Sequence, residues 1–162
     1  MKKKIKIIDS FEIKDSENYG INGIVSLKDD KGNIIFKKQN MIVEGGRTAI
    51  LKSFRGQSSG KIIGGVIKFG SGSSSSIVVY PSDESLGNAI SSLDTDLTAN
   101  NVNFDFEERT ITINIELNPN SSELISELGI FLTDITMFSR VIFEEVSLIS
   151  GTSYTLEYII YF

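Results

Sequence analysis

Histidine and cysteine, which most often carry acid–base or thiolate chemistry near neutral pH, are both absent from this 162-residue chain. The sequence therefore excludes imidazole bases, cysteine nucleophiles, thiolate metal sites and disulfide bonds. The serine run Ser73–Ser76 could supply a hydroxyl nucleophile. A Ser–His pair is impossible, however, and no nucleophile-elbow motif surrounds these serines. We predict no catalytic role for them.

Carboxylates are the next candidates for chemistry. Glu107–Glu108 and Glu144–Glu145 are adjacent pairs, and adjacent residues of a strand point to opposite faces of the sheet. Neither pair by itself offers the facing carboxylates that glycoside hydrolysis needs, although two carboxylates from distant strands remain an open alternative. The stretch Asp29–Asn33 could bind calcium, but it lacks the spaced oxygen ligands of an EF-hand loop. A turn is the preferred interpretation.

Other motifs also favour structure over chemistry. The glycines between residues 60 and 72 do not form a phosphate-binding loop, because no G-x-x-x-x-G-K-[ST] pattern is present and no helix follows them. Glu127 and Arg140 lie in apolar strand-like runs, which predicts a structural ion pair across the sheet. The sequence thus predicts no enzyme activity and no catalytic, cofactor-binding or metal site.

The elements that position these residues are mostly strands. Alternation of apolar and polar residues, typical of half-buried strands, recurs along the chain. The clearest case is a hairpin with arms at 101–106 and 110–117 and a turn at 107–109. Short runs around the turn at 28–32 predict a second hairpin. The remaining predicted strands cover residues 4–13, 61–69 (with a Gly-Gly kink), 125–131, 137–143 and 154–162.

Along these strands the alternation also predicts which side chains share a buried face. Residues 44–54 are predicted to form one short helix ending at Gly56. The side chains expected on apolar faces are Ala49, Ile50, Leu51 and Phe54 of the helix, Val102, Phe104, Phe106, Ile111, Ile113, Ile115 and Leu117 of the hairpin, and Tyr154, Leu156, Tyr158, Ile160 and Phe162 of the final strand.

This pattern predicts a mainly β fold, an antiparallel β-sandwich or jelly-roll-like structure with one short helix near 44–54. The length predicts a single β domain over residues 1–162. Composition predicts a mobile Gly/Ser loop at 70–76. Lys6 and Asp9 interrupt any signal-peptide core, and no apolar run is long enough to cross a membrane.

Charge is divided unevenly along the chain. Residues 1–68 carry 14 Lys and Arg against 7 Asp and Glu, whereas residues 69–162 carry 2 against 14. The two halves could interleave and neutralise each other locally, or they could form a basic and an acidic face suited to contacts between copies. On the second alternative the basic interface residues are Lys2, Lys3, Lys4, Lys37 and Lys38. Nucleic acid binding is not predicted, because the first lysines alternate with isoleucines as on the solvent side of a strand.

Four short blocks, in order, carry a resemblance. They are Asn40-Met-Ile-Val-Glu-Gly-Gly-Arg47 before the helix, Ile67-Lys-Phe-Gly-Ser-Gly72, the segment Pro81–Ile90, and a closing block that contains Glu-Leu-Gly-Ile-Phe131 and Phe-Ser-Arg-Val-Ile-Phe143. Over roughly residues 20–162 the chain resembles small virion structural proteins of tailed bacteriophages. It departs from them in lacking a long fibre segment and a tryptophan in the final strand.

The resemblance implies a non-enzymatic component of a tailed-phage virion, or of a phage-tail-like particle, made in the host cytoplasm. Such a protein associates with copies of itself, as a homo-oligomer within the particle, and docks onto other virion proteins of the tail, baseplate or collar. Two alternatives stay open: a capsid decoration protein, and a glycan-binding module for host attachment.

Overall fold

The structure, a computed structural model, describes residues 20–72 and 78–162 of the chain. The strand predicted for residues 4–13, the lysines at positions 2 to 4 and the serine run Ser73–Ser76 lie outside the described residues. The described elements, in chain order, are β1 (Asn22–Lys28), β2 (Ile34–Ile42), α1 (Glu44–Phe54), β3 (Val66–Ser71), β4 (Asn88–Ala89), the 3-10 turn η1 (Ser91–Leu93), β5 (Thr95–Asp96), β6 (Val102–Asp105), β7 (Thr110–Leu117), β8 (Glu123–Phe131), β9 (Met137–Leu148) and β10 (Tyr154–Tyr161).

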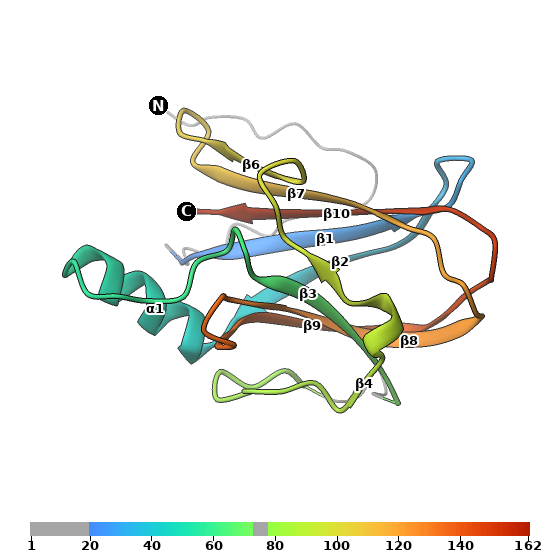
Figure 1. The fold of residues 1–162 in the computed structure, drawn as a ribbon, viewed down its shortest axis with the longest axis horizontal. Helices are drawn as coiled ribbons and strands as arrows, with labels where there is room; N and C mark the ends of the chain where they lie inside the picture. The colour runs from blue at the N-terminus through green and yellow to red at the C-terminus, as the bar shows by residue number, and fades with distance from the viewer. Residues whose placement is uncertain (1–19, 73–77) are drawn as a thin grey trace.

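All strand pairs are antiparallel, and they form one curled sheet in the order β4-β3-β8-β9-β2-β1-β10-β7-β6, with β5 also paired to β3. Strand β2 joins the two parts of this sheet, because it pairs with β1 from Ile34 to Asn40 and with β9 at Met41 and Ile42. As a result β1, β10, β7 and β6 form one layer, and β3, β8 and β9 form the other (Figure 1). The predicted mainly antiparallel, sandwich-like fold with one helix at 44–54 is confirmed over the described ranges.

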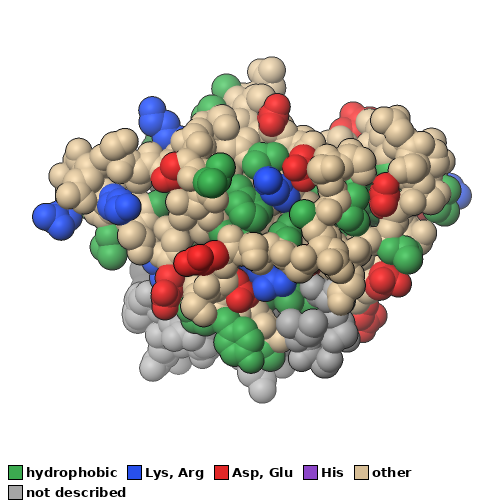
Figure 2. All heavy atoms as spheres, turned by 60° about the horizontal axis from the view of Figure 1, so that its bottom comes forward, with side chains coloured by type: hydrophobic (Ala, Val, Ile, Leu, Met, Phe, Trp, Pro, Cys, Tyr) green, Lys and Arg blue, Asp and Glu red, His purple; other side chains and the backbone are tan. Residues whose placement is uncertain are grey.

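Strands from the basic first half of the chain pair with strands from the acidic second half. β1 pairs with β10 and β2 with β9, and β3, which crosses the boundary between the halves, pairs with β8. Lys68 and Asp94, one from each half, lie 4.0 Å apart. Figure 2 shows acidic and basic side chains together on the face that carries β4. The two halves therefore interleave, and this face does not have a single sign of charge.

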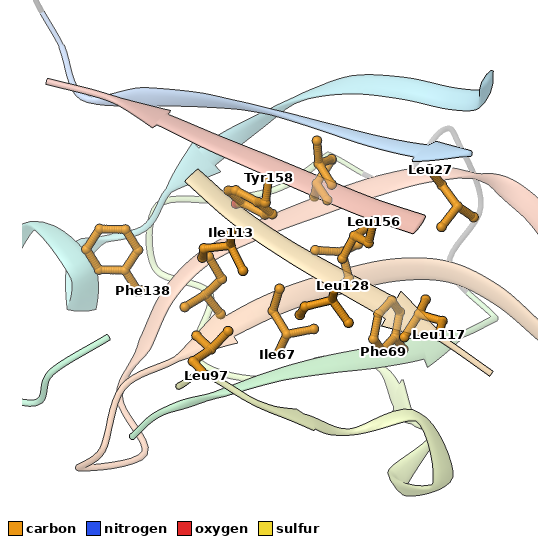
Figure 3. Close-up of a cluster of buried hydrophobic side chains, with 14 of the residues drawn as sticks. Leu27, Ile67, Phe69, Leu97, Ile113, Leu117, Leu128, Phe138, Leu156 and Tyr158 are labelled. Carbon is orange, nitrogen blue, oxygen red and sulfur yellow. The ribbon is translucent and has the colours of Figure 1, made fainter. Parts of the chain in front are cut away.

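The core fills the space between the two layers. Ile113 and Leu156 of one layer point toward Ile67 and Leu128 of the other (Figure 3), and all four side chains are fully buried. The predicted faces of β7 and β10 are confirmed within the strands, since the alternating residues are buried, but the prediction is wrong at Phe162, which lies beyond β10 and is half exposed. The buried alternating residues are Ile111, Ile113, Ile115, Leu117, Tyr154, Leu156, Tyr158 and Ile160.

Strand β6 does not follow its predicted pattern. Val102 is buried, but Phe104 is partly exposed and Phe106 is almost fully exposed. β6 is an edge strand that pairs with β7 alone among the described strands and ends at Asp105. The carboxylate of Asp105 accepts the N–H groups of Glu107 and Glu108, so the turn begins at Phe106 and that side chain leaves the sheet.

Helix α1 begins and ends where the sequence predicts, but its buried face differs. The N–H groups of Gly56 and Gln57 close a Schellman motif on the carbonyls of Ser53 and Lys52, and Gly56 has a positive φ of 67°. The predicted stripe is wrong at Leu51 and Phe54, which are exposed.

The physical reason lies on the opposite side of the helix. Gly46 and Ala49 are its buried residues, and a Cβ atom on Gly46 would overlap the carbonyl oxygen of Phe138. The helix therefore packs on β9 through its smallest side chains; Leu51 and Phe54 point outward, whereas Ile50 is partly buried against the core.

The strand predicted for 61–69 starts only at Val66. Residues 61–65 form a turn in which Gly64, with a φ of 89°, donates its N–H to the carbonyl of Leu97. The two glycines thus precede the strand instead of kinking it. At its other end β3 includes Gly70 and Ser71, so the predicted loop does not begin at residue 70.

Candidate functional site

The predicted ion pair between Glu127 and Arg140 is confirmed. Nη2 and Nε of Arg140 lie 2.5 and 3.0 Å from Oε2 of Glu127. Glu127 is fully buried and Arg140 nearly so. A third group, missed by sequence reasoning, completes the cluster: Oδ2 of Asp83 lies 2.7 Å from Nη1 of Arg140. No local pattern indicates this contact, because Asp83 lies in a non-repetitive segment far along the chain.

The ion pair lies beneath a segment that crosses the outer face of β8 and β9, residues 79–90, which we call the strap. The N–H of Gly87 donates to Oε1 of Glu127 at 2.7 Å, and the carbonyl of Pro81 accepts the N–H of Glu44 at 2.7 Å. Leu86 packs in a second apolar cluster, separate from the main core. That cluster contains Val43, Leu86, Phe131 and Met137. Charge pairing and apolar packing together hold the strap on the sheet.

The charges of Glu127, Arg140 and Asp83 serve to hold the strap on the sheet. Burial acts to lower the pKa of Arg140, but the hydrogen bonds to Glu127 and Asp83 outweigh it and raise that pKa. Arg140 therefore keeps its proton throughout the physiological range. Both oxygens of Glu127 are occupied by intramolecular donors. Both side chains are thus engaged in hydrogen bonds within the fold.

The other carboxylates considered from sequence lie at the surface. Oδ1 of Asp29 accepts the N–H groups of Lys31 and Asn33 at 3.0 and 2.8 Å, which confirms the predicted turn. The hydrogen bond from the side chain of Asn33 is the largest effect that lowers the pKa of Asp29. Within residues 20–72 and 78–162, no group of three or more acidic side chains is arranged to hold a metal ion. Over the same ranges no helix has the length and apolar character needed to cross a membrane.

The four most exposed large apolar side chains come from elements at one end of the molecule. Phe106, Ile135, Phe54 and Leu51 are 88, 85, 82 and 64% exposed. They come from the β6–β7 turn, the β8–β9 turn and α1, which all lie at the same end of the long axis (Figure 1). We call these four residues the apolar end.

Ile135 has an unusual backbone conformation, with a φ of 62°. A β-branched residue rarely adopts a positive φ, because its Cβ substituents crowd the backbone. The turn is held by two hydrogen bonds, from the N–H of Ile135 to the carbonyl of Leu132 and from the N–H of Leu132 to the carbonyl of Thr136. The strained turn presents an isoleucine side chain to solvent.

A groove of about 550 Å³ opens on another side, where β2 and β9 diverge. Residues 35–38 form one lip and residues 144–147 form the other, and we call this the β2–β9 groove. Two of the five predicted interface lysines, Lys37 and Lys38, lie on the first lip, and Glu144 and Glu145 lie on the second. The other three, Lys2, Lys3 and Lys4, lie outside the described residues.

Comparison with known proteins adds no assignment to these surfaces. No family model matches the sequence, and neither a curated protein nor a solved structure matches the chain.

Proposed function

We propose that this chain is a non-enzymatic structural component of a tailed-phage virion or a phage-tail-like particle, where it associates with copies of itself and docks onto the tail, baseplate or collar. The single observation that carries this proposal is the apolar end. Several large apolar side chains exposed at one end of a folded protein are consistent with a site of protein–protein contact. The order of the four sequence blocks supports placement in the virion.

The residues of the apolar end are supplied by separate elements of the fold. They come from two turns and one helix that are distant in sequence. In α1 the exposed Leu51 and Phe54 lie on the same helix as the buried Ala49. In a protein that stayed monomeric, polar residues would serve at these positions, and glycine or asparagine would relieve the strain at Ile135. Apolar side chains there are consistent with burial against a partner.

Replacing Phe54 and Phe106 together by serine is expected to weaken self-association without weakening the fold. Truncation of a central aromatic contact typically costs about 2 kcal/mol of binding free energy, so the dissociation constant should rise well over tenfold. The unfolding free energy should change by no more than about 0.5 kcal/mol, as for other exposed positions. Sedimentation velocity and thermal unfolding measure the two effects.

The matched control replaces Leu124 and Ile149, which are exposed apolar residues outside the apolar end, by serine. This variant should associate like the wild type. A wild-type protein that stays monomeric at high micromolar concentration would contradict self-association. Antibody labelling of purified particles tests placement, since decoration along the tail, baseplate or collar is expected. Labelling of the capsid shell would favour a decoration protein, and specific binding on a glycan array would favour host attachment.

A further inference from the structure

Two strand edges face each other across the β2–β9 groove without a strand between them. From Ile34 to Asn40, β2 pairs with β1 on one side, and within the described residues no strand pairs with its other side. From Phe143 to Leu148, β9 likewise pairs only with β8. Unpaired backbone N–H and C=O groups of this kind form a template for an added strand.

A bulge in β9 makes the groove. Ile125 pairs with Val146 and Glu127 with Ile142, so that residue 126 of β8 faces residues 143–145 of β9. Extra residues in one strand bend it and end its regular pairing. Phe36 lines the groove, and its ring stacks on that of the buried Phe143 with centroids 4.0 Å apart. The groove thus has an apolar lining at Phe36 and two open edges.

The lips carry opposite charge. Lys37 and Lys38 lie on β2, and Glu144 and Glu145 lie on β9. Within the described part of the chain, no ion pair joins the two lips. Lys38 shares its strand face with the buried residue Phe36. An inward-facing charge on an edge strand hinders unspecific pairing, so an entering segment must bring a carboxylate to Lys38.

We propose that the β2–β9 groove receives residues 4–13 of a neighbouring copy of this chain as an added strand; this rests on the self-association proposed above. On one face of this alternating segment Ile5, Ile7, Phe11 and Ile13 could cover the groove beside Phe36, and Asp9, on the same face, brings a carboxylate to Lys38. The opposite face carries Lys4, Lys6, Ile8, Ser10 and Glu12. Its lysines complement the glutamates of the β9 lip, and Glu12 complements Lys37 of the β2 lip.

The length of the segment also fits. Ten extended residues span roughly 33 Å, which is longer than the seven- and six-residue edges of the groove, 34–40 and 143–148. The sheet order favours a neighbouring copy as the donor. Residue 20 leads into β1, and β2 separates β1 from the groove. The pairs Met41–Arg140 and Ile42–Ser139 close the end of the groove nearest to that point.

Disulfide cross-linking of the full chain tests the proposal, because the protein contains no cysteine of its own. A Ser10→Cys chain is mixed with a Ser147→Cys chain that carries a mass tag, and the mixture is oxidised mildly. A covalent heterodimer is expected. A Ser150→Cys chain, with its cysteine exposed outside the groove, is the matched control and should give a several-fold lower yield.

Charge reversal provides the second arm. A Ser147→Cys chain that also carries Glu144→Lys and Glu145→Lys should cross-link roughly three- to fivefold less than its parent. Lys4→Glu and Lys6→Glu in the Ser10→Cys chain should restore the yield. Raising the salt to 1 M, where the Debye length is about 3 Å, should reduce the parental yield as well. If the yield of the cross-link changes neither with the charge reversals nor with salt, the electrostatic basis of the proposal is wrong.

Two further outcomes would overturn the proposal. If a chain carrying both Ser10→Cys and Ser147→Cys forms only an internal disulfide, the segment belongs to the same copy. If no cross-link exceeds the control while sedimentation still shows an oligomer, the groove does not take this segment although self-association stands. A monomer in sedimentation would instead contradict the proposed function.

Discussion

A chain ending at Ser153 is expected to lose its folded structure and aggregate. It lacks β10, which pairs with β1 over seven residues and with β7 over eight. Four buried side chains go with it, Tyr154, Leu156, Tyr158 and Ile160. At about 1.5–3 kcal/mol each, their burial is comparable with the 5–15 kcal/mol of net stability typical of a domain. The truncation also exposes the edges of β1 and β7, which favours aggregation.

Solubility and far-ultraviolet circular dichroism measure this outcome. The matched control ends at Tyr161 and lacks only Phe162, which lies beyond β10 and is half exposed. The control should stay soluble, with a small loss of stability from the hydrogen bond between the N–H of Phe162 and the carbonyl of Arg109. A soluble chain ending at Ser153 with an unchanged Tm would show that β10 is not integral to the sheet.

Replacing Arg140 by methionine should be the most destabilising of the single substitutions considered. The change leaves the fully buried Glu127 without its positive partner. Removing one partner of a buried pair costs about 3–5 kcal/mol, because the other charge stays desolvated. For a chain of this size 1 kcal/mol corresponds to about 2–4 °C in Tm, so a fall of roughly 6–20 °C is expected in thermal unfolding.

Two further variants show whether the loss of Tm comes from the unpaired buried charge or from the loss of any ion pair. Removing both charges, with Arg140→Met and Glu127→Leu, should recover part of the lost Tm, because no unpaired charge remains. Lys68→Met removes the exposed ion pair to Asp94 and should cost no more than about 1 kcal/mol. Equal losses of Tm in Arg140→Met and Lys68→Met would contradict a special role for the buried pair.

The sequence predicted those elements whose side chains obey a local period. The faces of β7 and β10, the hairpin of β1 and β2, and the limits of α1 follow from alternation and from a helix-ending glycine. The pair of Glu127 and Arg140 was predictable too, because both charges interrupt apolar strands. In these cases the responsible interaction lies within a strand, a turn or one pair of neighbouring strands.

Other features depend on contacts that no short window contains. Leu51, Phe54 and Phe106 look like core residues by pattern, yet their exposure depends on where the helix and the turn lie against the rest of the fold. Asp83 reaches Arg140 only because the strap crosses two strands. The β2–β9 groove arises from a bulge and a change of pairing partner in β2. The charged residues of its two lips could be read from the sequence, but not that β2 and β9 lie next to each other.

The position of β10 also constrains the time course of folding. In chain order β10 is the last of the described strands, yet it joins the first strand, β1, to β7. The two pairings that join β1 to β7 through β10 therefore wait until residues 154–161 have been synthesised. Contacts between such distant residues slow folding, since chain entropy is lost before the contacts form. We expect β1 and β2 to leave the ribosome as a hairpin in need of shielding, and the sheet to form as a late, cooperative step after synthesis.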